Sequence, residues 1–313
     1  MNRKIPPVLL IVFNRLHTTR RVFQAIREAQ PARLFIAADG PRPDNADDAE
    51  KSEAVRQYVL ENIDWECEVK TLFRAENLGC GPGPATAISW FFEHVEEGVI
   101  LEDDCLPHPE FWEYCGELLD KYRDNKQIAV ISGNNFQEGK KYGKASYYFT
   151  KYVTAWGWAT WRRTWQDCQF DLNLVDKDFV WRKIDSTFKN SAERTYWKSV
   201  FNKAAVSSKD IWDYQFCFHV WSKDMFCIAP NVNLVQNIGF GDDATHTFDP
   251  NSKAAFVKTG PLLPLIHTRK IEISNKADEF IFAHYYSPYP PVNLFKRVIR
   301  KFKRIVRKFF LKS

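Results

Sequence analysis

Short apolar runs alternate with helical patterns through the first 132 residues, and this alternation constrains the fold more than any other feature of the chain. Strands are predicted at 8–13, 34–38, 68–73, 99–101 and 128–132, and helices at 18–29, 49–61, 84–94 and 109–122. Strands that alternate with helices form parallel sheets covered by helices. We therefore predict an α/β protein with a doubly wound, mostly parallel sheet.

The pattern changes from Tyr147 onward, where Trp and Tyr residues cluster and helical segments dominate. Helices are predicted at 179–184, 192–205 and 212–222, and a strand at 226–229. The polar stretch 231–249 reads as irregular and suited to a mobile lid. A chain of 313 residues is long enough for one α/β core with an appended subdomain.

Three acids, Glu102, Asp103 and Asp104, follow directly on the fourth predicted strand. Ligands of such sheets bind beyond the carboxyl ends of the strands, where Arg15 and Asp39 also fall. Carboxylates so close together repel one another, and a divalent cation would relieve the repulsion. Mg²⁺ and Mn²⁺ suit carboxylates and are often held by one or two of them plus substrate phosphates. The alternative is a solvated acidic turn without a function.

The order of these motifs resembles the GT-A glycosyltransferases, most closely the N-acetylglucosaminyltransferase I group and its bacterial relatives. In that group an Asp-x-Asp motif takes the form Glu-Asp-Asp at a strand end, as at 102–104 here, before a Pro and an aromatic-rich helix. The other matching segments are 12–15, 38–40, 77–79, 156–158 and 211–213. The resemblance covers about residues 8 to 245. It implies a GT-A fold in which 1–135 binds a nucleotide sugar and 136–290 binds the acceptor and carries catalysis.

The resemblance also implies roles for single residues. Arg15 would contact phosphate or base, and Asp39 would accept a hydrogen bond from uracil, with a turn-forming role as its alternative. Asp104 would bind Mn²⁺ or Mg²⁺, while Asp103 and Glu102 would contact ribose or metal-bound water. The donor expected from this set is a nucleotide diphosphate sugar, with UDP favoured as the carrier.

Asp213 is the candidate base for the acceptor hydroxyl, and Glu102 and Asp210 are its rivals. Attack from the face opposite the leaving group would invert the anomeric centre. The alternative is that Asp213 only caps the helix that follows it. We therefore predict an inverting, metal-dependent glycosyltransferase that acts on an acceptor hydroxyl of a glycan or a lipid-linked glycan.

Two weaker signals come from the second half. The Gly-rich, acidic segment 239–246 could close over the diphosphate, with His246 reaching metal or phosphate. Four tryptophans could form a wall on which sugars stack, or they could belong to the core: Trp156, Trp158, Trp161 and Trp165.

The segment 291–313 is predicted to be a basic amphipathic helix. Residues 293–313 hold nine Lys or Arg and no acid, with apolar residues at helical spacing between them. Such a helix lies on an anionic membrane surface. Docking on the protein body is an alternative, and the regular apolar face argues against nucleic acid as the partner.

The location expected from the sequence is cytoplasmic, peripheral on the inner face of the membrane. No run reaches the roughly 20 apolar residues of a spanning helix, and the first apolar run is too short for a signal peptide. Seven cysteines without C-x-x-C spacing fit a reducing compartment.

Two rival functions remain open at this point. A sugar-phosphate nucleotidyltransferase would share the sheet but should carry a Gly-rich Arg-Lys loop after the first strand, where this chain has Asn-Arg-Leu-His at 14–17. A non-catalytic carbohydrate-binding or membrane-associated scaffold with a GT-A-like fold would neither hydrolyse nor transfer a donor.

Overall fold

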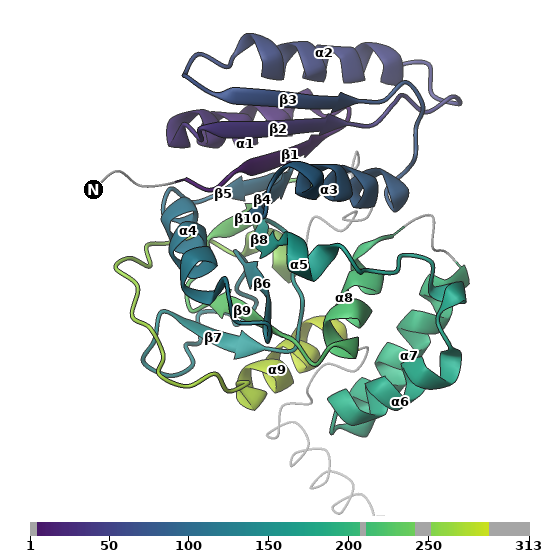
Figure 1. The fold of residues 1–313 in the computed structure, drawn as a ribbon, viewed down its shortest axis with the longest axis vertical. Coiled ribbons are helices and arrows are strands. Elements are labelled where there is room, and N and C mark those ends of the chain that lie inside the picture. Colours follow the sequence, from purple (N-terminus) through teal and green to yellow (C-terminus); the bar gives the residue numbers. More distant parts are fainter. Residues whose placement is uncertain (1–4, 207–210, 242–251, 288–313) are drawn as a thin grey trace, which may run out of the picture.

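The computed structural model describes residues 5–206, 211–241 and 252–287 (Figure 1). Its centre is an eight-stranded sheet. The strand order is β3 (Glu68–Phe73), β2 (Arg33–Ala38), β1 (Val8–Val12), β4 (Glu97–Glu102), β8 (Trp158–Trp161), β6 (Ile128–Ser132), β9 (Phe226–Pro230) and β7 (Tyr147–Thr150).

Of these described strands, β8 and β7 run against the other six, because β8 pairs antiparallel with both β4 and β6, and β7 with β9. The pairs among β3, β2, β1 and β4 are parallel, as is the pair of β6 and β9. The predicted α/β fold with a mostly parallel sheet is confirmed.

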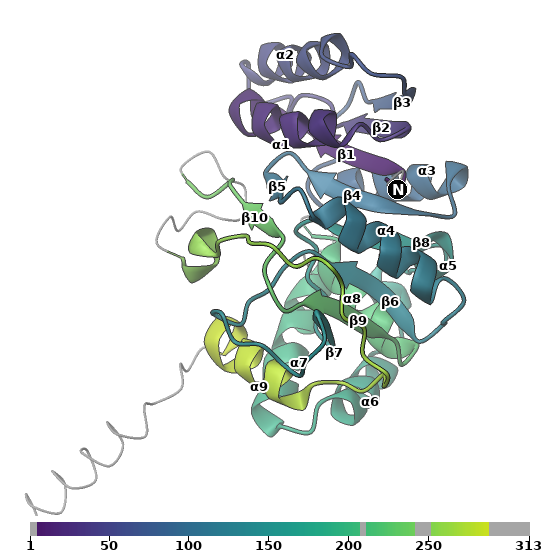
Figure 2. The same cartoon turned by 90° about the vertical axis from the view of Figure 1, so that its left-hand side faces the viewer.

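Helices cover both faces of the sheet (Figure 2). One face packs on α1 (Leu16–Ala29), α2 (Asp48–Glu61) and α4 (Phe111–Tyr122). The other packs on α3 (Pro82–His94), α5 (Arg162–Trp165), α6 (Lys177–Thr187), α7 (Ser191–Val206) and α8 (Asp213–Ser222). Neighbouring strand residues such as Leu9 and Leu10 enter different clusters, so both faces are buried and the strands read as continuous apolar runs.

The aromatic segment holds two strands that the sequence did not reveal. The pattern from Tyr147 onward predicted mainly helices, yet β8 lies in the middle of the sheet and β7 at its edge, both with all their residues buried. A strand buried on both faces loses the alternation of apolar and polar residues that would identify it. β8 lies between β4 and β6, so segments from both sides of the predicted boundary at residue 135 share one sheet.

The stretch 231–249, predicted to be irregular, contains one short strand in its described part, 231–241. Here β10 (Val235–Asn237) pairs antiparallel with β5 (Cys105–Pro107). The side chains of Asn231, Asn233 and Asn237 are buried and hydrogen-bonded, so the amides hold the backbone in place where a regular ladder is missing. The rest of the predicted lid lies outside the described residues.

The described chain continues through the short 3₁₀ turns Leu172–Leu174 and Lys253–Phe256 and ends with α9 (Asn275–Ile281) and the π turn Phe282–Tyr286. Asp210, His246 and the amphipathic helix predicted at 291–313 lie outside the described residues. Within the described part, the helices all fall short of the length and apolar content that crossing a membrane requires.

Candidate active site

The carboxyl ends of three neighbouring strands form the rim of the candidate site. Val12 pairs with Ala38, and Ile11 pairs with Glu102, so the residues that follow β1, β2 and β4 come together at one edge. The predicted site residues at 15, 39 and 102–104 lie at this edge or in the loops that follow it. Short loops after parallel strands therefore place polar groups side by side at the position where such sheets bind ligands.

Arg15 is the cation of this rim. Its Nη2 donates to Asp103 Oδ1 at 2.6 Å and to Asp104 Oδ2 at 2.8 Å. The backbone N–H of Phe13 adds a third hydrogen bond, to Asp103 Oδ2 at 3.3 Å. Burial disfavours the charge of Arg15, but the two carboxylates outweigh this and raise the pKa of its guanidinium. Arg15 thus supplies part of the compensation that the sequence assigned to a cation.

The rim nevertheless holds more carboxyl groups than cations. Burial, followed by the charges of Asp104, Asp103 and Asp213, raises the pKa of Glu102 to about 8. Burial also raises the pKa of Asp103 to about 6, against the opposing effect of Arg15. One guanidinium cannot neutralise three carboxylates, so the site favours protonation of Glu102 or the arrival of a further positive charge.

Asp213 lies close to this cluster although it is far from Glu102 in the sequence. It is the first residue of α8, and its charge is among those that raise the pKa of Glu102. Its Oδ1 accepts the backbone N–H of Tyr214 at 3.0 Å. The predicted base therefore lies near the predicted donor site. The N-cap position of α8 is held by Trp212, without a side-chain hydrogen bond to the helix, so Asp213 is not the helix cap.

Asp39 anchors a loop. Its carboxylate accepts the backbone N–H groups of Leu78, at 2.9 and 3.1 Å, and of Gly79, at 3.0 Å. These bonds hold the segment 77–79, which leads into α3. The geometry matches the alternative of a structural Asp, and recognition of uracil by Asp39 stays a prediction.

A buried acid that the sequence analysis overlooked stabilises the neighbouring corner. Asp48 accepts hydrogen bonds from Asn14 Nδ2 at 2.8 Å and from Arg42 Nη2 at 3.0 Å. The hydrogen bonds from Arg42 lower the pKa of Asp48 despite its desolvation. The Arg42 guanidinium also lies 5.5 Å from the centre of the Phe13 ring. The sequence signal was an acid at a helix start with an arginine six residues earlier.

Gly239 closes the rim over Asp104. The pairing of β10 with β5 brings Asn237 beside Cys105, and the Ile238 N–H donates to the Asp104 carbonyl at 2.8 Å. A Cβ added at Gly239 would collide with the carboxylate of Asp104 and lie 2.7 Å from Arg15 Nη1. Only glycine permits this approach, and its partners became visible only in the fold.

The residues fit a divalent cation only together with ligands from a substrate. No group of three or more His, Cys, Asp or Glu among the described residues could hold a metal ion by itself. The surplus of carboxyl groups at this edge, which raises the pKa of Glu102 beyond the effect of burial, suits the type of site where a carboxylate and substrate phosphates share Mg²⁺ or Mn²⁺. Metal binding by Asp104 stays a prediction, and His246 lies outside the described residues.

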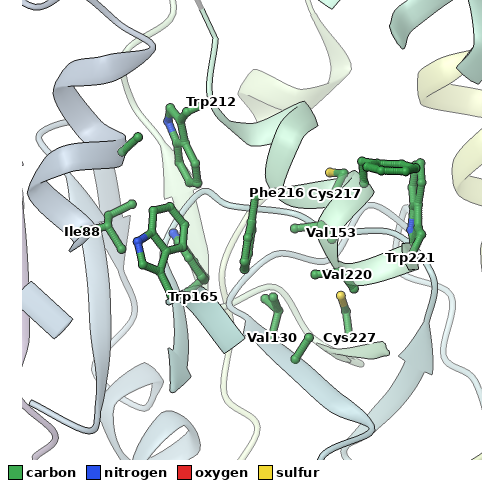
Figure 3. Packing of buried hydrophobic residues seen from close by; sticks show 14 of the residues in the cluster. Ile88, Val130, Val153, Trp165, Trp212, Phe216, Cys217, Val220, Trp221 and Cys227 are labelled. Atoms are coloured by element: carbon green, nitrogen blue, oxygen red, sulfur yellow. The ribbon is translucent and has the colours of Figure 1, made fainter. Parts of the chain in front are cut away.

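Of the four tryptophans predicted to form a sugar-stacking wall, three are buried in the core, and Trp156 remains a candidate. Trp158, Trp161 and Trp165 are at most 2% exposed and belong to the core, so they cannot contact a sugar. Trp165 packs with Trp212 and Phe216 inside one hydrophobic cluster (Figure 3). Trp156 is half-buried, and its ring lies 5.4 Å from Phe136 and 5.8 Å from Phe240, measured between ring centres. Phe240 follows Gly239, which packs on Asp104, so Trp156 lies near the rim of the site.

Neither a protein-family model nor a curated protein matches the sequence. Solved structures with some similarity include a UDP-glucose pyrophosphorylase complexed with UDP-glucose, at 12% identity over 72% of this chain and 90% of that one, with a TM-score of 0.37. The inositol-1-phosphate CTP transferase from T. maritima has 10% identity over 72% and 85%, with a TM-score of 0.36. Mouse xyloside xylosyltransferase 1, in its apo form, has 10% identity over 68% and 80%, with a TM-score of 0.31.

The neighbours thus include nucleotidyltransferases and a glycosyltransferase, at TM-scores below 0.5. Such low scores carry no argument about the activity of this chain, so the functional argument rests on the site alone. The more specific resemblance to the N-acetylglucosaminyltransferase I group stays a prediction.

Proposed function

We propose that the protein is an inverting glycosyltransferase that moves a sugar from a nucleotide diphosphate sugar, with UDP as the favoured carrier, to an acceptor hydroxyl of a glycan or lipid-linked glycan. The observation that carries the proposal is the meeting of Arg15, the buried Asp103 and Asp104, the half-buried Glu102 and Asp213 at the carboxyl edge of the sheet. This arrangement offers a cation for phosphate, a place for a metal and a separate base.

The donor diphosphate would lie against Arg15 and Asp104. A permanently charged guanidinium can contact phosphate oxygens, and Arg15 is already directed into the rim by its two carboxylate partners. Asp104, with Asp103 beside it, would hold Mn²⁺ or Mg²⁺ there, and the bound cation would neutralise charge on the leaving diphosphate. Gly239 packs on Asp104, where a side chain would displace the carboxylate.

Asp213 is the better candidate base than Glu102. Glu102 directly precedes Asp103 and Asp104, against which the donor would lie, whereas Asp213 comes from a separate element, the first turn of α8, and could approach the acceptor hydroxyl independently. In the proposed step the acceptor oxygen forms its bond to the anomeric carbon while the bond from that carbon to the diphosphate oxygen breaks. The hydroxyl proton passes to the Asp213 carboxylate, and the bonding electron pair leaves with the diphosphate.

The structure offers little room for a nucleotidyltransferase loop. Residues 13–15 alone connect β1 to α1, and Arg15 within them is already paired with Asp103 and Asp104. The reaction products separate the two activities, because glycosyl transfer releases a nucleoside diphosphate whereas nucleotidyl transfer releases pyrophosphate.

The decisive experiment follows release of nucleoside diphosphate and pyrophosphate from a panel of nucleotide sugars, with and without Mn²⁺. We expect Asp213→Asn to lower kcat by about 10²- to 10⁴-fold while donor affinity remains, as for loss of a general base. The control is Asp167→Asn, which changes an exposed acid elsewhere on the molecule. Release of pyrophosphate, or failure of every nucleotide sugar to bind, would overturn the proposal.

We also propose that residues 291–313 attach the protein to an anionic membrane, on the inner, cytoplasmic face. The support is the sequence: nine basic residues within 293–313, without an acid, interleaved with apolar residues at helical spacing. Deletion of 293–313 should release the protein from vesicles that contain phosphatidylserine. Unchanged vesicle binding after the deletion would exclude this role.

A further inference from the structure

A cavity of about 600 Å³ shares none of its lining residues with the candidate site and takes no part in the mechanism proposed above. Its volume falls within the range of small-molecule sites. The walls come from the loop after β6, the start of the β9–β10 connection, the turn at Lys253–Phe256 and the π turn at the end of the described chain. The lining residues used below are Asn135, Lys141, Asn231, Asn233, Lys258 and Tyr285.

Buried asparagines make the walls of this cavity rigid. Asn135 Nδ2 donates to the Pro230 carbonyl at 2.6 Å, and Asn233 Oδ1 accepts the backbone N–H of Asn135 at 2.8 Å. Asn231 binds both the N–H and the carbonyl of Tyr142. Because these amides are occupied by the backbone, the cavity keeps its shape without a ligand, which lowers the cost of binding.

The charge at the mouth of the cavity is positive. Three lysines, Lys141, Lys253 and Lys258, face one acid, Glu138. Lys253 Nζ lies 2.8 Å from Glu138 Oε1, whereas Lys141 and Lys258 form no ion pair with any described residue. Two ammonium groups are therefore left to attract an anion.

Half-buried aromatic rings connect the cavity to the acid cluster. The Tyr285 ring lies 5.2 Å from Phe136, Phe136 lies 5.4 Å from Trp156, and Trp156 lies 5.8 Å from Phe240, between ring centres. Phe240 follows Gly239, which packs on Asp104. The strand from Asn233 to Asn237 spans about 13 Å over the same route. Flat apolar ring surfaces thus line the way from the lysines to the site of transfer.

We propose that this cavity is the acceptor subsite and that it binds an anionic sugar, one that carries a carboxylate or a phosphate group. Lys141 and Lys258 contact the anionic group, Tyr285 and Trp156 contact the sugar rings, and the reacting hydroxyl extends toward Asp213. The assignment rests on the proposed function for the reaction, but the binding itself can be measured without it. A donor diphosphate cannot be the occupant, because its cation site lies at the other end of the aromatic run.

The experiment measures binding to the full-length protein by calorimetry, in the absence of donor. The probes are trigalacturonate, its neutral methyl ester and N-acetylglucosamine 1-phosphate, which separate a carboxylate from a phosphate as the recognised group. The test variant is Lys141→Glu/Lys258→Glu. The control is Lys126→Glu/Lys189→Glu, which makes the same change of charge at exposed positions away from the cavity. Melting curves confirm that both variants fold.

We expect at least one anionic probe to bind the wild type and the control, and the test variant to bind it at least tenfold more weakly. The methyl ester should bind more weakly than trigalacturonate, and added salt should reduce the difference. The proposal is overturned if neither anionic probe binds the wild type, or if both double variants bind alike.

The two proposals can fail separately. If a lysine-dependent anionic probe binds while no nucleotide sugar does, the cavity is confirmed and the proposed transferase reaction is wrong. If nucleotide sugars bind and react but anionic probes bind irrespective of the lysines, the acceptor subsite is wrong and the reaction stands.

Discussion

Two buried groups of carboxylic acids in this protein differ in how their charge is balanced. Asp278, a residue of α9 with 1% exposure, accepts the Thr150 hydroxyl and the Lys151 backbone N–H, and the Lys151 ammonium lies 3.9 Å away. At the sheet edge, Arg15 is the one cationic side chain among the described residues that pairs with Asp103 and Asp104, next to Glu102.

Both groups have raised pKa values, about 7 for Asp278 and about 8 for Glu102, and burial is the largest cause in each case. A raised pKa therefore does not distinguish a functional site from a structural one here. The two groups differ in their surplus of acids. Near Asp278, two buried acids, Asp278 and Glu193, lie around one lysine, Lys151, whereas at the sheet edge Glu102, Asp103 and Asp104 lie around one arginine. Four predictions test this difference.

The largest expected effect concerns activity. Asp104→Asn should lower kcat/KM by about 10³-fold, because the substitution removes a carboxylate that would hold the cation at the leaving diphosphate. Asp278→Asn should leave kcat/KM within about threefold of wild type, since its contacts are structural. Initial rates of nucleoside diphosphate release measure both. Equal losses of kcat/KM in the two variants would contradict a functional role for Asp104 that Asp278 lacks.

The second prediction concerns stability, and here the substitution at Asp278 should have the larger effect. Asp278→Ala should lower the free energy of unfolding by about 2–4 kcal/mol, because the buried partners on Thr150 and Lys151 lose their acceptor. Glu102→Gln should leave stability unchanged or higher, because the folded protein already favours the neutral form of that side chain. Urea denaturation measures both. A stability loss for Glu102→Gln as large as that for Asp278→Ala would contradict the assignment.

The third prediction concerns pH. Both carboxyl groups have folded pKa values above their unfolded values of about 4, so between those values the folded state binds more protons than the unfolded state. Their stabilising effect is complete below about pH 4 and is lost as the pH rises toward 7 and 8. The melting temperature should therefore fall from pH 5 to 8. Mn²⁺ should reduce the contribution of Glu102 to this fall in melting temperature and leave the contribution of Asp278 unchanged.

The fourth and smallest effect concerns Gly239. Gly239→Ala should weaken binding of Mn²⁺ with donor by about three- to tenfold, because the new methyl group displaces the Asp104 carboxylate or Arg15. Gly260→Ala is the control, since its added Cβ would meet only a Val232 methyl group at 3.2 Å. Equal affinities for both variants would show that the approach of Gly239 to Asp104 is not needed for binding.

The first half of the fold could be predicted because β1, β2, β4 and β6 are short, mainly apolar runs that end at polar residues. The strands at 68–73 and 128–132 have the predicted bounds. β7 and β8 escaped prediction because their aromatic residues are buried on both faces, so periodicity could not separate them from helix or core. The role of Asp39 was open for another reason: its partner Leu78 lies 39 residues away.

The sequence alone determined that acids follow β4 and that an arginine follows β1, because the ends of apolar runs can be read locally. Only the tertiary structure decided that Arg15 pairs with Asp103 across 88 residues, that Gly239 packs on Asp104, and that Asp213 faces Glu102. The physical reason is that local periodicity fixes which side chains leave a strand or helix on a given face. Which charges then meet depends on strand register and on the packing of the layers, and these are set by contacts between segments far apart in the chain.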